Sequence, residues 1–279
     1  EEPKINTIID AYRSVLASYN NTEIGQTTVP IDTMSAFTAE TNGANLQADA
    51  SVYVLRDVND IPVDFHLSGA MTNKLIATTA TEAVPYTLKI SDMFTAMPYE
   101  NSLVVLSMNG PQLKAVLERA YRNYYYYKYV PGYGGYSYYT TCMLDTNFGN
   151  NIGYNDTYPA LPDGNNVMYL KIGGDLVDFN DATHFYNVST VNYLAAGSCN
   201  FKDGTTSLWP LDQIVADTQF YVRDAVIEYV THEGIVSPQI EGRLVFNPES
   251  LTSISPDSAV AGSPAITLFV RGTGFTSSS

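Results

Sequence analysis

Positive charge is scarce in this chain of 279 residues. It carries 14 lysines and arginines against 29 aspartates and glutamates, which gives a formal net charge of −15. Nucleic-acid binding depends on cationic side chains that neutralise phosphates, so the composition argues against a nucleic-acid partner. Charged residues of both signs make up only 15% of the chain, while Ser, Thr, Asn, Gly and Tyr are abundant. This balance is more typical of β-rich extracellular surfaces than of cytosolic enzymes.

Long apolar runs are also missing. A membrane-spanning helix needs about 18 or more consecutive apolar residues, and no such stretch occurs, so we expect no membrane insertion. The chain starts at Glu1-Glu2-Pro3, from which we expect a processed or excised fragment.

Residues that carry catalytic or metal chemistry are few. The three histidines, His66, His184 and His232, have no HxH or HxxxH spacing, and the GxSxG, P-loop and CxxC motifs are absent. The carboxylates in GGDLVDFND lack the order of a calcium-binding EF-hand loop and indicate a solvated turn. We therefore predict no catalytic residue and no metal site in this chain.

The chain has only two cysteines, Cys142 and Cys199, so it allows one disulfide. The alternative is a pair of small buried thiols. Three sequons, at Asn20, Asn155 and Asn187, permit glycosylation in a secretory setting. Together with the composition, these features favour a secreted or cell-surface protein.

The hydrophobic pattern predicts an α+β fold, with a mixed or antiparallel sheet and flanking helices. Helical spacing occurs in three segments, strand patterns occur in four, and Asn109-Gly110 indicates a hairpin or tight turn. The predicted helices cover residues 4–19, 111–127 and 217–234, and the predicted strands cover 63–69, 167–172, 184–194 and 241–246. In addition, 39–55 and 86–110 each predict a short helix followed by a strand, and 140–166 predict a loop-rich zone. A shift to Ser, Pro, Thr and Gly predicts a main domain over 1–247 and a short β segment or linker over 248–279.

Tyrosines are concentrated in YRNYYYYKYVPGYGGYSYY, residues 121–139, which contains ten of the chain's 22. The first of these rings extend the apolar stripe of the preceding helix, and Pro131 with three glycines predicts a loop or strand for the remainder. Tyrosine buries a large area with few torsions and keeps a polar tip, which suits protein contacts. We therefore predict an interface, formed by Tyr125, Tyr126, Tyr129, Tyr133 and Tyr136.

Four further segments occur in a characteristic order: ETNGANLQADA, ISDMFTAMPYENSLVVLSMNGPQLKAVLE, VNYLAAGSCNF and IEGRLVF. Together they resemble the C-terminal domain of the 5'-nucleotidase family, over about residues 4–246. In that family a metallophosphoesterase domain holds two divalent metals and performs hydrolysis, and the C-terminal domain binds the nucleoside. The resemblance implies that this chain has no cofactor of its own and does not hydrolyse phosphate esters alone.

The same resemblance implies a degenerate nucleoside site made of Gly69, Asn101, Gly197 and Phe201. Thr72 stands where the family has a substrate-binding arginine, and the nearby Lys74 lacks a planar bidentate fork. Phe201 corresponds to one of two base-stacking aromatics, and Leu103 takes the place of the other. GSCNF replaces the family's Gly-Gly-Asp-Gly-Phe.

The tail LTSISPDSAVAGSPAITLFVRGTGF resembles the first strands of an IPT/TIG immunoglobulin-like module. Unpaired strand edges favour pairing with another chain, so we expect a homo-oligomer or contact with neighbouring surface modules through this strand, with Phe269 as a contact.

Two candidate functions follow from these sequence features. The first is an extracellular structural, self-assembling or adhesive protein built on the degenerate domain, which is our main interpretation. The alternative is the nucleoside- or nucleotide-binding domain of a secreted 5'-nucleotidase-like hydrolase.

Overall fold

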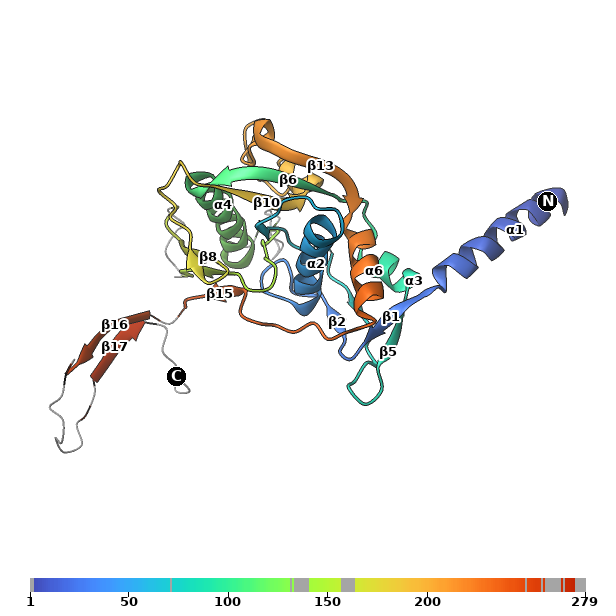
Figure 1. Ribbon diagram of the computed structural model, residues 1–279, viewed down its shortest axis with the longest axis horizontal. Coiled ribbons are helices and arrows are strands. Elements are labelled where there is room, and N and C mark those ends of the chain that lie inside the picture. Colours follow the sequence, from blue (N-terminus) through green and yellow to red (C-terminus); the bar gives the residue numbers. More distant parts are fainter. Residues whose placement is uncertain are drawn as a thin grey trace.

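A computed structural model of the protein describes residues 3–70, 72–130, 132, 141–156, 164–248, 250–256, 258, 267 and 269–273. Helices and short mixed sheets alternate along the described chain, which confirms the predicted α+β class (Figure 1). The helices are α1 (Pro3–Asn20), α2 (Asn42–Val52), α3 (Ile90–Ala96), α4 (Gly110–Tyr129), α5 (Asn192–Ala195) and α6 (Val222–Glu233), with a π-helix at Tyr53–Val58 and a 3-10 helix at Leu211–Gln213.

The central sheet has the strand order β13-β6-β10-β3. β6 pairs antiparallel with both β13 and β10, whereas β10 and β3 run parallel. Six of the eight residues of β6, SLVVLSMN, are buried because both faces of this strand are covered. The strands are β3 (Phe65–His66), β6 (Ser102–Asn109), β10 (Phe185–Val191) and β13 (Ile214–Tyr221).

Smaller sheets complete the body, with the orders β14-β1-β5, β15-β7-β8-β9, β2-β4 and β11-β12. One of their strands, β7, lies in the zone 140–166 that we expected to be rich in loops. The bounds are β1 (Glu23–Thr27), β2 (Ile31–Asp32), β4 (Leu75–Ile76), β5 (Tyr86–Lys89), β7 (Asn151–Tyr154), β8 (Val167–Ile172), β9 (Asp175–Leu176), β11 (Lys202–Asp203), β12 (Thr206–Ser207), β14 (Ile235–Val236) and β15 (Leu244–Phe246).

Two helices of the body begin at side-chain caps. Asn109 Oδ1 accepts the N–H of Gln112 at 3.2 Å, and Gln112 Oε1 accepts the N–H of Asn109 at 2.9 Å, so the pair forms a capping box for α4. Thr41 caps α2 by accepting the N–H of Ala44. The predicted turn at Asn109-Gly110 is therefore a helix start and not a hairpin. A Cβ at position 110 would overlap the backbone carbonyl oxygen of Asp178, so only glycine fits there.

Two other predicted elements differ from the structure. Residues 53–58 continue α2 as a π-helix instead of forming a strand, and residues 217–221 belong to β13, so that α6 begins only at Val222. In both segments the spacing of the apolar residues suits a helix as well as a strand. Pairing with β6 makes 217–221 a strand, and packing on α6 keeps 53–58 helical.

The first half of the tyrosine-rich segment is buried helix. Tyr121, Tyr124 and Tyr125 in α4 are 0%, 1% and 2% exposed, so Tyr125 is not available as a surface contact. Tyr126 and Tyr129 are half-buried against the core. Tyr133 and Tyr136 lie outside the described residues.

The hydroxyl groups of this segment meet at one carboxylate. Asp156 accepts from Tyr121, Tyr124 and Tyr129 at 3.0, 2.9 and 2.8 Å, and Lys128 Nζ lies 3.3 Å away. Phe246 stacks on Tyr124 with ring centroids 4.7 Å apart. The tyrosines thus join α4 to β7 and β15 within the protein's own core.

Cys142 and Cys199 form a disulfide, the bridge considered from the sequence. It connects the segment before β7 to the turn after α5. At the ends of the chain, α1 and a hairpin of β16 (Ser250–Ser255) and β17 (Phe269–Thr273) extend away from the body (Figure 1). Within the described ranges, no helix combines the length and apolar character that crossing a membrane requires.

Candidate functional site

A small hollow lies where four elements of the main body meet. It is lined from α2, the segment after β3, the start of β6 and the first residue of α6. Two of the predicted site residues, Gly69 and Asn101, lie here together. The lining residues are Ala44, Gln47, Ala48, His66, Ser68, Gly69, Thr72, Met97, Tyr99, Asn101, Val191 and Val222. The hollow holds only about 30 Å³, so an organic ligand would lie over its mouth instead of entering it.

Two carboxamides at this hollow have unused hydrogen-bonding groups. The side chains of Asn101 and Gln47 form no hydrogen bond with any described residue, although the backbone carbonyl of Asn101 accepts from the N–H of Val222 at 3.0 Å. Each amide offers both a donor and an acceptor. Such groups match the edge of a nucleobase or the hydroxyls of a ribose.

The polar groups at the floor are neutral. Burial lowers the pKa of His66 to about 3, so its imidazole is uncharged at physiological pH, and its Nδ1 lies 2.8 Å from Ser189 Oγ. Thr72 donates its hydroxyl to the carbonyl of Ala96 at 2.6 Å. No Asp, Glu, Lys or Arg is among the described residues that line the hollow. The site therefore favours uncharged polar groups.

Two exposed aromatic rings stand at the same end of the paired strands β6 and β10. Tyr99, two residues before Asn101, lines the hollow and is 61% exposed. Tyr193 is 48% exposed and follows Asn192, whose Oδ1 accepts the N–H of Ser102 at 3.2 Å. The exposed ring of Tyr99 near the Asn101 amide offers a stacking face for a planar ligand.

The other two predicted site residues, Gly197 and Phe201, do not line the hollow. Phe201 is fully buried, with its ring centroid 6.1 Å from that of Trp209, and Leu103 is fully buried within β6. Neither side chain is exposed enough to stack on a ligand, so the stacking role that the resemblance gave to Phe201 is corrected. Gly197 has a positive φ of 89°, and a Cβ there would lie 3.1 Å from Lys202 Cβ, so the glycine shapes the turn before Phe201.

Tyr99 and Tyr193 were not among our predicted site residues. Their signal in the sequence was an aromatic residue next to a polar one, in PYEN just before β6 and in VNYL just after β10. Phe201 drew attention because it follows a glycine-containing turn. The N–H of Phe201 donates to the carbonyl of Ser198, and the carbonyl of Phe201 accepts from the N–H of Leu208. These two hydrogen bonds orient the ring toward the core.

A buried carboxyl lies behind the hollow. The backbone of Asp145 pairs with that of Ser68 through two hydrogen bonds of 3.1 and 2.7 Å. Burial raises the pKa of the Asp145 carboxyl to about 8, with Glu40 and Asp49 adding to the shift, while the Thr146 N–H and Arg243 oppose it. The side chain thus stays protonated at neutral pH. The Asp145 carboxyl therefore adds no charge to the site, and its backbone pairing holds Ser68 in place.

The described residues contain no group of three or more His, Cys, Asp or Glu side chains able to hold a metal ion. The groups that line this hollow are neutral, and they include polar amides and an exposed aromatic ring.

The fold defines a mixed α+β domain, and comparison with known proteins gives its family. The family model for the 5'-nucleotidase C-terminal domain matches residues 23–204. The chain therefore belongs to the 5'-nucleotidase C-terminal domain family. No comparison supports the immunoglobulin-like module that we expected after it.

The chain is similar to the trifunctional nucleotide phosphoesterase protein YfkN of Bacillus subtilis (strain 168), with 27% identity over 256 residues. This match covers 89% of the chain and 16% of the relative. The chain thus spans a minor part of that protein's length.

Two solved structures share the fold. A 5'-nucleotidase precursor from Thermus thermophilus matches with a TM-score of 0.62 and 19% identity, covering 86% of this chain and 42% of that structure. The NAD nucleotidase of Haemophilus influenzae matches with a TM-score of 0.62 and 17% identity, covering 88% and 41%. In both cases the chain spans less than half of the protein that it resembles.

Proposed function

We propose that this chain is the nucleoside-binding domain of a 5'-nucleotidase-like hydrolase whose hydrolytic domain lies outside the chain. Asn101 carries this proposal: it lines the hollow, its side-chain amide forms no hydrogen bond with a described residue, and the exposed ring of Tyr99 stands beside it. Stacking on exposed rings and hydrogen bonds to carboxamides are the two interactions that a nucleoside requires.

The lining of the site refines the ligand class. Phosphate recognition depends on cationic or backbone N–H groups, and no Lys or Arg side chain is among the described lining residues. The domain therefore binds the base and ribose, and a 5'-phosphate would point away from it. Adenosine and AMP should consequently bind with similar affinity.

Titration calorimetry with adenosine, AMP and ribose 5-phosphate tests this function. We expect adenosine and AMP to bind within about threefold of each other, because the base and ribose supply the contacts, and ribose 5-phosphate to bind more weakly. Asn101→Ala should weaken adenosine binding about tenfold by removing two hydrogen bonds. Asn165→Ala, an amide change on the exposed surface near Lys114, serves as the matched control. Absence of heat with both adenosine and AMP at millimolar concentration would refute the proposal.

The family relationship favours this function over the structural or adhesive role that the sequence suggested first. Self-association remains a prediction, and sedimentation velocity over a hundredfold range of concentration tests it. A single monomer peak throughout would remove the adhesive role.

We also propose a secreted or cell-surface location. The disulfide between Cys142 and Cys199 supports it, because disulfides persist in oxidising compartments and are rare in the cytosol. Mass spectrometry of the protein isolated from its source, alkylated before reduction, measures the state of both sulfurs. Two alkylated thiols in the native pool would contradict this location.

A further inference from the structure

A second concave surface lies on a different face of α2 from the nucleoside-site hollow. Ala44, Gln47 and Ala48 line that hollow, whereas Asn45 and Asp49 line the second surface. We call it the α2–α6 cleft. It is formed by α2, the π-helix, the end of α6, the loop at 147–148 and the segment from β14 to β15, and it encloses about 500 Å³. This volume lies within the range of about 300–1,000 Å³ that is typical of small-molecule sites.

The charges that line the α2–α6 cleft do not balance. Four carboxylates, Asp49, Asp57, Glu233 and Glu241, face two guanidinium groups, Arg56 and Arg243, which leaves a net charge of −2 from these six side chains. A cleft with one sign of charge concentrates ions of the opposite sign.

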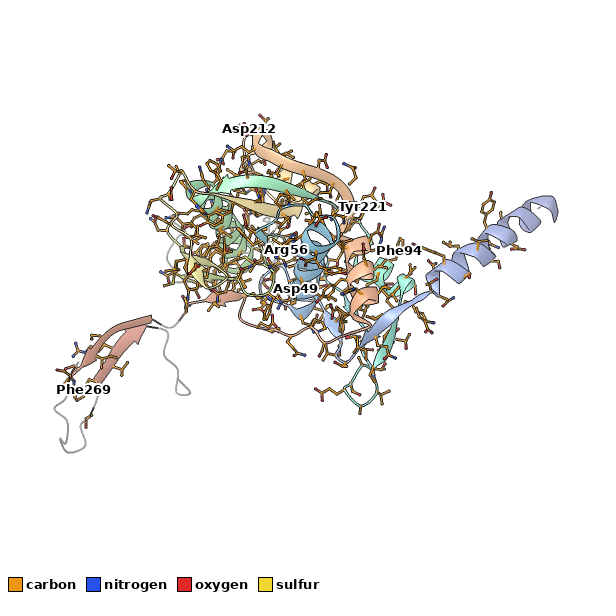
Figure 2. All side chains as sticks on the ribbon, viewed as in Figure 1. Asp49, Arg56, Phe94, Asp212, Tyr221 and Phe269 are labelled. Atoms are coloured by element: carbon orange, nitrogen blue, oxygen red, sulfur yellow. A yellow bond between two sulfur atoms is a disulfide. The ribbon has the colours of Figure 1, made fainter. Side chains whose placement is uncertain are left out.

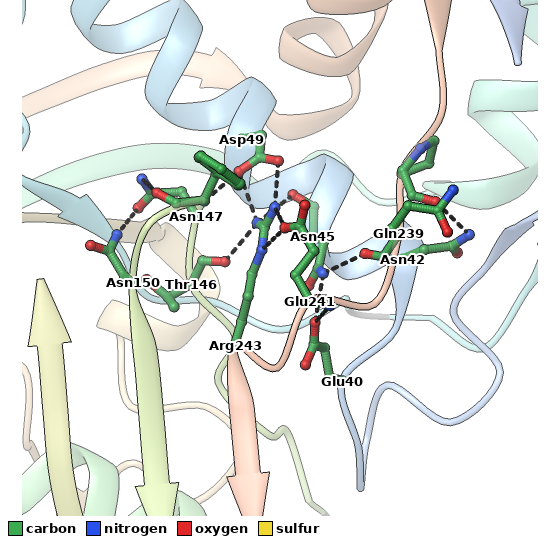
Figure 3. A network of polar contacts seen from close by, with 12 residues as sticks. Glu40, Asn42, Asn45, Asp49, Thr146, Asn147, Asn150, Gln239, Glu241 and Arg243 are labelled. Carbon is green, nitrogen blue, oxygen red and sulfur yellow. Dashed lines mark hydrogen bonds and ion pairs between the residues drawn. The ribbon is translucent and has the colours of Figure 1, made fainter. Parts of the chain in front are cut away.

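The guanidinium groups are already occupied. Arg243 is 4% exposed and forms ion pairs with Asp49 at 2.8 Å and with Glu241 at 2.6 Å, and it also donates to the carbonyl of Thr146 (Figure 3). Arg56 is paired with its neighbour Asp57 at 2.9 Å. Glu233, at the end of α6, has neither a hydrogen bond nor an ion pair with any described residue. Its carboxylate thus lacks a cation within the described part of the chain.

Aromatic rings accompany these carboxylates. Tyr53 and Tyr229 pack edge to face with centroids 5.4 Å apart, and His232 lies 4.9 Å from Tyr53 on the same side. Phe148 is 71% exposed, and its backbone N–H donates to Asp49 at 2.7 Å, which holds the ring at the cleft. Aromatic faces and carboxylates together are the groups that bind organic cations.

A buried acceptor without a donor gives independent support. Asn45 lines the α2–α6 cleft and is 1% exposed; its Nδ2 donates to Glu40 and to the carbonyl of Gln239, but its Oδ1 accepts no hydrogen bond. An unsatisfied buried acceptor costs about 1–3 kcal/mol. A ligand N–H that enters the cleft would supply the missing donor.

We propose that the α2–α6 cleft binds an organic cation, an alkylammonium group that Glu233 neutralises and that Phe148 and the Tyr53–Tyr229 pair contact through their rings. The group is carried either by a free polyamine or by a lysine side chain of a peptide. This site goes beyond the nucleoside site and does not depend on it.

Titration followed by amide chemical shifts tests the proposal, with spermidine and with a capped lysine peptide as the two probes at about 150 mM NaCl, where exposed charges are screened. We expect saturable shifts at residues 147–148 and 233–239 with at least one probe. Glu233→Gln should weaken binding about fivefold and Phe148→Ser by a similar factor, since each removes one contact with the cation. Glu82→Gln, an equal loss of charge on an exposed loop away from the cleft, should change it less than about twofold.

The outcomes separate the alternatives. Binding of spermidine alone assigns the cleft to a small molecule, and binding of the peptide alone assigns it to a basic partner segment. Equal weakening by Glu233→Gln and Glu82→Gln would show general attraction to an acidic surface and would overturn the proposal. Absence of saturation with both probes would also overturn it. The amide spectrum of Glu233→Gln away from the cleft should match that of the unchanged protein, which reports that the variant is folded.

Discussion

Removal of the Asp156 carboxylate tests whether the tyrosines of α4 serve the core. In Asp156→Ala, the phenols of Tyr121 and Tyr124 lose their acceptor while both side chains stay at most 1% exposed. Tyr129 and Lys128 also lose a partner, but they are more exposed and gain water instead.

The size of the effect follows from the two buried phenols. A buried donor left without an acceptor costs about 1–3 kcal/mol, so two of them cost about 2–6 kcal/mol, and we expect about 3 kcal/mol after relaxation. For a domain of this size, about 1 kcal/mol lowers Tm by about 2–4 °C, so the variant should melt about 6–12 °C lower. Asp156→Asn keeps one acceptor oxygen and should lose about half as much.

Thermal melts followed by circular dichroism measure this effect. Asp212→Ala is the matched control, because this aspartate lies on the surface in the 3-10 helix and makes no hydrogen bond with a described residue (Figure 2). A melting temperature for Asp156→Ala within about 1 °C of the control would show that the carboxylate does not stabilise the tyrosine cluster.

Three further predictions concern stability and activity. Burial raises the pKa of Asp145 to about 8 in the folded protein, whereas the unfolded chain releases this proton near the ordinary pKa of 3.8, so stability falls as pH rises between these values. Asp145→Asn should remove up to about 1.4 kcal/mol per pH unit of that slope in urea titrations at about pH 5–7, and an unchanged slope contradicts the assignment. Replacing Cys142 and Cys199 with alanine should cost about 4 kcal/mol in urea unfolding, because the bridge closes a separation of 57 residues; a loss below about 1 kcal/mol argues otherwise. The isolated chain should release no phosphate from AMP with Mg²⁺, Mn²⁺ or Zn²⁺, and turnover proportional to protein would disprove this.

Much of the fold was accessible from the sequence, because apolar periodicity reports burial directly. The stripe of Leu113, Val116, Leu117 and Ala120 predicts α4, and all four side chains are fully buried. The errors fall where one pattern suits two elements. Residues 217–221 have the apolar spacing of the helix that follows, but hydrogen bonds to β6 make them strand, and such long-range pairing leaves no local signal.

The candidate site could be predicted from the sequence only in part. Gly69 and Asn101, which we inferred from recognisable motifs, line one hollow. Phe201 does not line it: Phe201 and Tyr193 lie in the same short motif, and the backbone path after Gly197 leaves Phe201 buried and Tyr193 exposed. At Tyr125 the prediction of a surface contact was wrong for a similar reason. Tyrosine suits both interfaces and cores, and the buried partner Asp156 lies 27 to 35 residues away from the tyrosines that it binds.

The central claim is that this chain binds a nucleoside at the hollow lined by Asn101 and Tyr99, and we propose that Tyr99 and the exposed Tyr193 are its stacking faces. The most direct test is calorimetric adenosine affinity in Tyr99→Ala and Tyr193→Ala, with Tyr12→Ala, an equally drastic change on the exposed face of α1, as the control. Each site variant should lose about 1–3 kcal/mol of binding free energy, about 5- to 150-fold in Kd, and the control should lose none. Adenosine affinity that is the same in all three variants would contradict the claim.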